Sequence, residues 1–179
     1  MFIQTETTPN PNSLKFVPGR KISLVGPIEI TDISQTNNEL IRNILSIDGV
    51  TGVFLSDNFI SVNKKNDYIW EDLKHIIISF INDFFSQGNN VVISESYEQS
   101  EVDTSTVEGQ IKKILDTKIR PAVARDGGDI KFKDYKNGIV RVELQGACSG
   151  CPSATLTLKQ GVQNLLCHYI PEVREVEAV

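Results

Sequence analysis

Cysteine is scarce in this chain of 179 residues, which contains only Cys148, Cys151 and Cys167. Three thiols cannot form the multi-disulfide framework that stabilises small secreted proteins. The cysteine content therefore favours a reducing compartment, in which thiols serve redox or metal chemistry.

Long apolar runs and an excess of positive charge are also missing. The longest apolar stretch, residues 76–85, is interrupted by Ser79, Asn82 and Asp83, and a membrane-spanning helix needs roughly 18 to 20 apolar residues. The 18 Lys and Arg residues are outnumbered by 23 Asp and Glu, and the net charge of -5 leaves no basic footprint for a phosphate backbone. We therefore expect a soluble protein with neither a membrane span nor a nucleic-acid partner.

The N-terminal residues 1–15 show no targeting pattern. They lack the basic and apolar regions of a secretory signal and the arginine-rich composition of a transit peptide. We expect a bacterial cytoplasmic protein, with the mitochondrial matrix as the alternative if a presequence has been removed.

Composition divides the chain into two parts. Residues 95–105, ESYEQSEVDTS, lack apolar periodicity and are rich in serine and acidic residues, as linkers are. We predict one domain over residues 1–94, a linker over 95–105 and a second domain over 106–179. Each domain is expected to be a small α/β sandwich of the α+β class.

The first half is predicted to form an antiparallel sheet covered by two helices. Strands are expected over residues 2–7, 13–17, 28–31, 53–55, 59–62 and 91–94. One helix follows Asn37 and Asn38 and ends at Gly49. A second helix, over residues 68–87, is expected to start at Asp67 as N-cap and to end at Gly88. Its predicted core stripe is Trp70, Leu73, Ile77, Phe80 and Phe84.

The second half is predicted to run helix, strand, strand, helix, strand. Ser105 and Glu108 fit a capping box ahead of a helix that stops before Pro121. Strands over 130–135 and 139–145 flank an Asn-Gly pair, which is a strong hairpin signal. A last helix begins near Pro152, is followed by a strand over 173–179, and has the predicted core stripe Leu158, Val162, Leu165 and Tyr169.

Cys148 and Cys151 form the candidate site. They lie on the loop over residues 146–153, GACSGCPS, just before the last helix. Free backbone N–H groups and the helix dipole favour the thiolate at such a position. A pair with this spacing fits a dithiol redox site, half of a zinc site, half of an iron–sulfur site, or an inert pair of small residues.

This pair alone cannot complete a metal site. Zinc could draw further ligands only from Cys167 and His168, which lie about 24 Å further along one continuous helix. The same separation excludes four thiolates from one chain, so any cluster needs a second chain, most simply in a homodimer. A thiol-disulfide oxidoreductase is disfavoured because the motif follows a hairpin rather than a βαβ unit. It remains an alternative, as does a structural zinc-linked dimer.

The other reactive residues receive structural interpretations. We expect Cys167 to be a bystander thiol, and His75 and His168 to lie at helix surfaces or ends. Gly127 and Gly128 lack the rest of a phosphate-binding motif and predict a tight turn. Asp126 and Asp129, next to Arg125, are interpreted as turn and surface charges on a loop that could approach the cysteine loop.

These motifs resemble a known family. Residues 146–153 together with residues 119–129, IRPAVARDGGD, are similar to the C-terminal domain of the Nfu (NifU-like) iron–sulfur proteins. Residues 2–16, FIQTETTPNPNSLKF, resemble the N-terminal domain specific to Nfu proteins. The resemblance touches both halves of the chain.

The resemblance implies a scaffold or carrier and not an enzyme. Cys148 and Cys151 would hold a labile 4Fe-4S cluster shared by two subunits. Upstream assembly proteins would supply this cluster, and apo iron–sulfur proteins would receive it as their thiolates displace those of the carrier. The N-terminal domain of this family has no cluster ligands and is associated with partner interaction. Cys167 lies outside the motif and takes no role from it.

Overall fold

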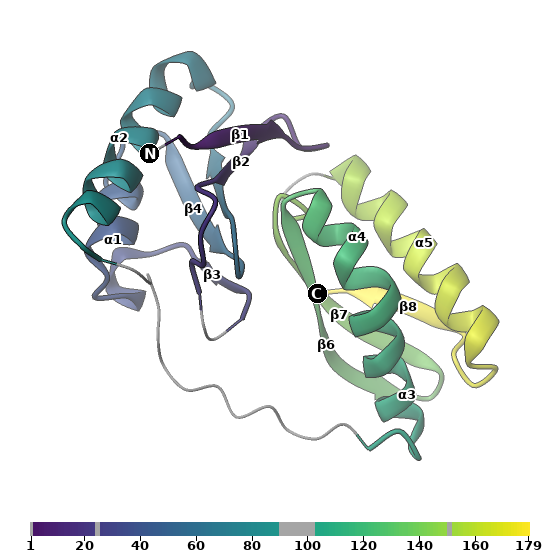
Figure 1. Cartoon of the computed structure of the whole chain (residues 1–179). Helices are drawn as coiled ribbons and strands as arrows, with labels where there is room; N and C mark the ends of the chain where they lie inside the picture. The colour runs from purple at the N-terminus through teal and green to yellow at the C-terminus, as the bar shows by residue number, and fades with distance from the viewer. Residues whose placement is uncertain (1, 24–25, 90–102, 150–151) are drawn as a thin grey trace. The chain divides into compact units, whose positions relative to one another are not determined.

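The computed structural model describes residues 2–23, 26–89, 103–149 and 152–179, with only the backbone for 152–154. The chain forms two compact units, Met1–Tyr97 and Glu98–Val179. Both combine a sheet with helices, so the α+β class is confirmed (Figure 1). The predicted linker over 95–105 and the predicted strand over 91–94 lie largely or wholly outside the described residues.

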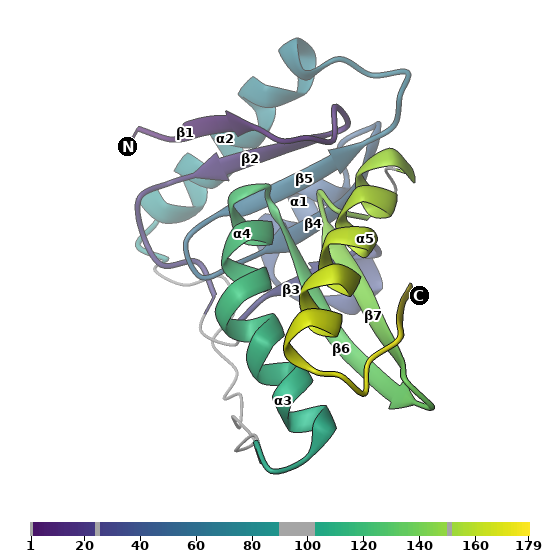
Figure 2. The ribbon, with the colours of Figure 1, turned by 90° about the vertical axis from the view of Figure 1, so that its right-hand side faces the viewer.

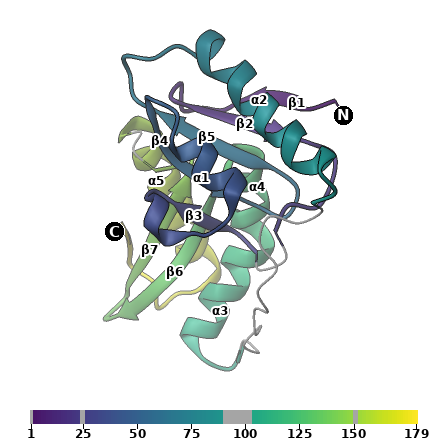
Figure 3. The same ribbon diagram turned by 90° about the vertical axis from the view of Figure 1, so that its left-hand side faces the viewer.

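Unit 1 is a five-stranded antiparallel sheet with helices α1 and α2 on one face (Figures 1 and 3). The strand order is β1-β2-β5-β4-β3. The strands are β1 (Gln4–Thr7), β2 (Ser13–Val17), β3 (Ile28–Ile30), β4 (Val50–Leu55) and β5 (Ile60–Lys64), and the helices are η1 (Ile33–Gln35), α1 (Glu39–Leu45) and α2 (Trp70–Ser86). The described strands and both predicted helices are confirmed, although α1 ends at Leu45 and not at Gly49, which adopts a φ of 94° in the turn that follows. The Asn38 side chain caps α1 by accepting from the Ile41 N–H at 3.3 Å.

The details of α2 differ from the prediction. Its buried residues are Leu73, Ile77, Ile81 and Phe85, whereas Phe80 and Phe84 are only partly buried. Apolar residues occupy more than one side of this helix, so the pattern did not fix the centre of the buried face. Asp67 is not the N-cap, because the Tyr68 N–H donates to the Lys65 carbonyl in a turn and the helix starts only at Trp70.

Unit 2 is a three-stranded sheet with all its helices on one face (Figure 2). Strand β6 (Gly128–Lys136) pairs antiparallel with β7 (Ile139–Gly146), and β8 (Glu175–Ala178) runs parallel to β7. The helices are α3 (Val107–Ile114), the π-helical segment η2 (Leu115–Ile119), α4 (Arg120–Arg125) and α5 (Pro152–Tyr169). The predicted order of elements is confirmed. Asn137 and Gly138 have φ angles of 51° and 82°, as a two-residue hairpin turn with both central residues left-handed requires.

Three predictions for the helices of unit 2 are wrong. Thr106, not Ser105, caps α3, and its hydroxyl accepts from the Gly109 N–H at 3.0 Å. The helical path does not stop before Pro121. The wider π-helical turn precedes it, so that Pro121 falls in the first turn of α4, where its missing N–H costs little. Tyr169 is 48% exposed, because the buried face of α5 follows Val162 and Leu166 at four-residue spacing and continues to Ile170.

Candidate functional site

Cys148 lies on the loop that leaves the β6–β7 hairpin. Gly128 at the start of β6 pairs with Gly146 at the end of β7. Gly146 adopts a φ of 66°, a left-handed conformation that favours glycine, and turns the chain out of the sheet. The N–H and the hydroxyl of Ser149 both donate to the Gly146 carbonyl, at 3.2 Å and 2.9 Å. Cys148 is thus held inside a closed turn directly after the strand.

The Cys148 side chain packs against the backbone of Gly128. A Cβ atom at Gly128 would lie 2.6 Å from the Cys148 Sγ and 2.6 Å from the Gln145 carbonyl oxygen. Next to it, the Ala147 N–H donates to the Gly127 carbonyl at 3.1 Å. We call residues 127 and 128 the glycine seat of Cys148.

The glycine seat was only half predicted from sequence. Gly127 has a φ of 81° and makes the expected tight turn, and the loop of Asp126 and Asp129 does approach the cysteine loop. The role of Gly128 was missed. One signal in the sequence could have indicated it: the turn needs a glycine only at position 127, so the second glycine, at position 128, calls for a separate reason.

The loop is also tied to the start of α5. The Thr155 hydroxyl donates to the Cys148 carbonyl at 3.1 Å. Cys148 is therefore fixed from the sheet side by the glycine seat and from the helix side by Thr155. Cys151 lies outside the described residues, between this turn and Pro152 at the first position of α5.

The environment of Cys148 stabilises the thiol and not the thiolate. Cys148 is 8% exposed, and burial, followed by the charges of Asp126 and Asp129, raises its pKa to about 12. For Cys148 in the metal-free chain, this is opposite to the expectation that the helix N-terminus favours the thiolate. Cys151, to which the same expectation applies, lies outside the described residues. A metal that binds Cys148 has to displace its proton.

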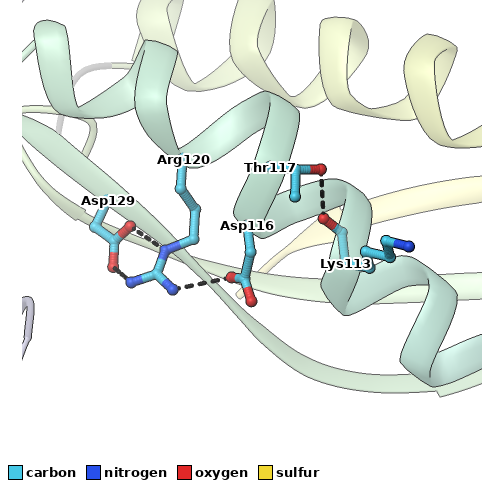
Figure 4. A network of polar contacts seen from close by, with 5 residues as sticks. All are labelled: Lys113, Asp116, Thr117, Arg120 and Asp129. Atoms are coloured by element: carbon cyan, nitrogen blue, oxygen red, sulfur yellow. Dashed lines mark hydrogen bonds and ion pairs between the residues drawn. The ribbon is translucent and has the colours of Figure 1, made fainter. Parts of the chain in front are cut away.

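Asp129 is a buried ion-pair partner and not the predicted surface charge. It is 3% exposed, and its two carboxylate oxygens accept from the Arg120 Nε at 2.8 Å and Nη2 at 3.1 Å (Figure 4). Arg120 also donates to Asp116 at 2.9 Å. No local pattern pairs Arg120 with a carboxylate nine residues away across a turn, so this contact was missed.

Cys167 and His168 lie near the end of α5 that is far from the cysteine loop. Cys167 lies near the C-terminal end of α5, about 22 Å along the helix from Pro152 at 1.5 Å per residue, and its Sγ is 3.8 Å from the Arg174 carbonyl. His75 and His168 are exposed on α2 and α5, as predicted. Among the described residues, no group of three or more His, Cys, Asp or Glu side chains is arranged to hold a metal ion, and no helix of this part of the chain is long and apolar enough to cross a bilayer.

The chain thus combines two α+β units with a glycine-seated cysteine loop in the second. Two family models match it: one described as scaffold protein Nfu/NifU N terminal, over residues 3–88, and one described as NifU-like domain, over residues 111–177. The chain belongs to the Nfu/NifU family.

Named relatives cover the whole chain. It is 45% identical to the human protein "NFU1 iron-sulfur cluster scaffold homolog, mitochondrial", an alignment that spans 100% of this chain and 72% of that protein. It is 44% identical to "NifU-like protein 4, mitochondrial" from Arabidopsis thaliana, over 99% of this chain and 65% of that protein. The chain therefore spans about two thirds of the length of these relatives. A NifU-like protein from Saccharomyces cerevisiae, solved by NMR, is 28% identical, with a TM-score of 0.48 over 54% of this chain and 87% of that one.

The names of the relatives bear on location. Both curated relatives are named as mitochondrial. The expectation of a bacterial cytoplasmic protein is at odds with these names, which favour the mitochondrial alternative.

Proposed function

We propose that this chain is a scaffold or carrier that holds a 4Fe-4S cluster between two copies and transfers it to apo iron–sulfur proteins. Cys148 and Cys151 of each copy are the proposed ligands. The observation that carries the proposal is the seat of Cys148 on Gly128, in a chain whose relative is named an iron–sulfur cluster scaffold. A mitochondrial location is proposed from the names of the relatives.

The number of available thiols supports a site shared by two chains. A 4Fe-4S cluster takes four cysteine ligands. The loop offers two, and the third thiol lies near the other end of α5. A second copy supplies the missing pair without a further ligand type.

The surroundings of Cys148 fit a cluster that is held and then released. Because Gly128 has no Cβ atom, the Cys148 sulfur can occupy the space next to it. The backbone of a glycine can also approach the inorganic sulfides of a cluster closely. In transfer, each client thiol loses its proton as it binds iron, and each departing cysteine gains one. The only bonds that form or break are those between iron and the exchanged thiolates. The proposed role is therefore ligand exchange and not catalysis.

Anaerobic reconstitution with iron and sulfide tests the proposal. We expect visible absorption, about four irons per two chains, and a dimer mass by light scattering. Cys148→Ser and Cys151→Ser should abolish iron binding, whereas Cys167→Ser, the matched control on α5, should retain it.

The other outcomes point to the alternatives. A colourless monomer with a reactive dithiol would indicate a thiol-disulfide oxidoreductase. One colourless zinc ion per two chains would indicate a structural zinc-linked dimer. Iron retention at the wild-type level in either loop variant would contradict the assigned ligands.

A further inference from the structure

The side chain of Arg120 joins the first turn of α4 to the start of β6. Its Nε and Nη2 bind both oxygens of Asp129, and its Nη1 binds Asp116 one turn earlier (Figure 4). A planar guanidinium that binds a carboxylate with two parallel hydrogen bonds fixes its partner in orientation as well as in distance. Arg120 thereby holds the Asp129 carboxylate in one orientation beside the start of β6.

Asp129 is covalently attached to the glycine seat. Gly128 precedes it, and Gly128 is the residue against which the Cys148 sulfur packs. The Gly127 carbonyl in turn accepts the Ala147 N–H at 3.1 Å. A continuous set of contacts therefore connects Arg120 to Cys148 through Asp129 and the glycine seat.

The two partners of this ion pair differ in burial. The Asp129 side chain is 4% exposed, whereas that of Arg120 is 32% exposed. If Arg120 is neutralised, a buried carboxylate is left without its counter-charge, which is strongly unfavourable. If Asp129 is neutralised, Arg120 keeps Asp116, a carboxylate that is 49% exposed. Loss of Arg120 should therefore disturb the seat far more than loss of the Asp129 charge.

We propose that Arg120 is a positioning residue for the cluster ligand Cys148, acting through Asp129 and the glycine seat. The proposal rests on the proposed function for what Cys148 binds. The position of the seat itself can be measured in the metal-free protein, so the two can fail separately.

Amide hydrogen exchange on the full metal-free chain tests the positioning. Arg120→Gln should accelerate exchange of the Ala147 amide by about tenfold, with little change at the amides of Val162 and Leu166 in α5. Asp129→Asn should have a smaller effect. The double variant, Arg120→Gln with Asp129→Asn, should exchange more slowly at Ala147 than Arg120→Gln alone, because the uncompensated buried charge is gone.

Arg141→Gln is the matched control. Arg141 also lies near two carboxylates, Asp134 at 3.8 Å and Glu177 at 3.5 Å, but its side chain is 52% exposed and lies on β7 away from the seat. This variant should leave Ala147 exchange at the wild-type rate. A purely global role of Arg120 would instead accelerate exchange at Ala147, Val162 and Leu166 together.

A second measurement uses the reconstituted protein. Release of iron to a chelator should be faster in Arg120→Gln by about 10-fold to 100-fold, the range for residues that support a metal ligand, and partly restored in the double variant. Wild-type exchange at Ala147 in Arg120→Gln, equal acceleration at all three amides, or no restoration in the double variant would overturn the positioning role. If the wild-type chain forms no cluster, the proposed function fails while the exchange data still decide the role of Arg120.

Discussion

Replacement of Gly128 by alanine isolates the seat of Cys148 with the smallest possible change. The added Cβ would lie 2.6 Å from the Cys148 Sγ, and ordinary contacts begin at 3.4 Å, so the sulfur must retreat by about 0.8 Å. The other close atom, the Gln145 carbonyl oxygen at 2.6 Å, belongs to the backbone of β7 and cannot rotate away. Metal–ligand distances tolerate only about 0.2 Å. We therefore expect Gly128→Ala to lose most of its iron.

The same contacts set the effect on folding. Overpacking of this kind costs about 1–3 kcal/mol, and in a domain of this size each kcal/mol lowers the melting temperature by roughly 4–8 °C. Differential scanning calorimetry of the metal-free chain measures this cost, and iron counting after reconstitution measures the loss of the site.

Gly161→Ala is the control for this substitution. Gly161 is exposed on α5, and a Cβ atom added there would meet no other atom within 4 Å. Alanine there should stabilise the helix by roughly 0.5–1 kcal/mol and leave iron binding intact. Wild-type iron content together with an unchanged melting temperature in Gly128→Ala would refute the assignment of the glycine seat.

Three further predictions concern the cap of α3, the Cys148 thiol and the two units. Thr106→Ala removes the side-chain acceptor of the Gly109 N–H and should cost about 1 kcal/mol of unfolding free energy, measured by urea titration; an unchanged midpoint would contradict the cap. Because the Cys148 pKa is raised from 9.0 to about 12, iodoacetamide should modify Cys148 at pH 8 more slowly in the folded metal-free chain than in urea; equal alkylation rates in both states would show a thiol in a water-like environment. For the same reason, the stabilising contribution of the buried thiol should be complete below pH 9 and disappear as the pH rises from 9 toward 12. Residues 98–179 alone should assemble the cluster and residues 1–97 should bind no iron; a folded C-terminal fragment that stays colourless would show that the cluster needs unit 1.

Local signals in the sequence predicted most of the fold. The Asn137-Gly138 turn and the end of α2 before Gly88 each depend on residues within a few positions of one another, and both formed as expected. Errors arose where several local solutions compete. On α2, apolar residues on more than one side allow two stripes, and only packing against the sheet selects the one with Ile81 and Phe85.

The site was predictable only in part, for a related reason. The cysteine spacing and the flanking glycines identify the loop from sequence. The contact of Gly128 with Cys148 and the pair of Arg120 with Asp129 depend on strand register and on how α4 meets β6. Neither is a property of spacing along the chain. Burial also reversed the expected effect on the Cys148 thiol, because the helix dipole argument takes no account of desolvation or of the two nearby aspartates.

The π-helical segment Leu115–Ile119 accommodates the proline that follows it within a continuous helical path. Deleting one residue from this segment would allow a regular helix with better hydrogen-bond geometry. It would also place Pro121 in a helix interior, where its ring meets the carbonyl four residues earlier and one backbone hydrogen bond is lost. A regular helix and Pro121 therefore exclude each other at this turn, so a one-residue deletion here should be less well tolerated than a substitution.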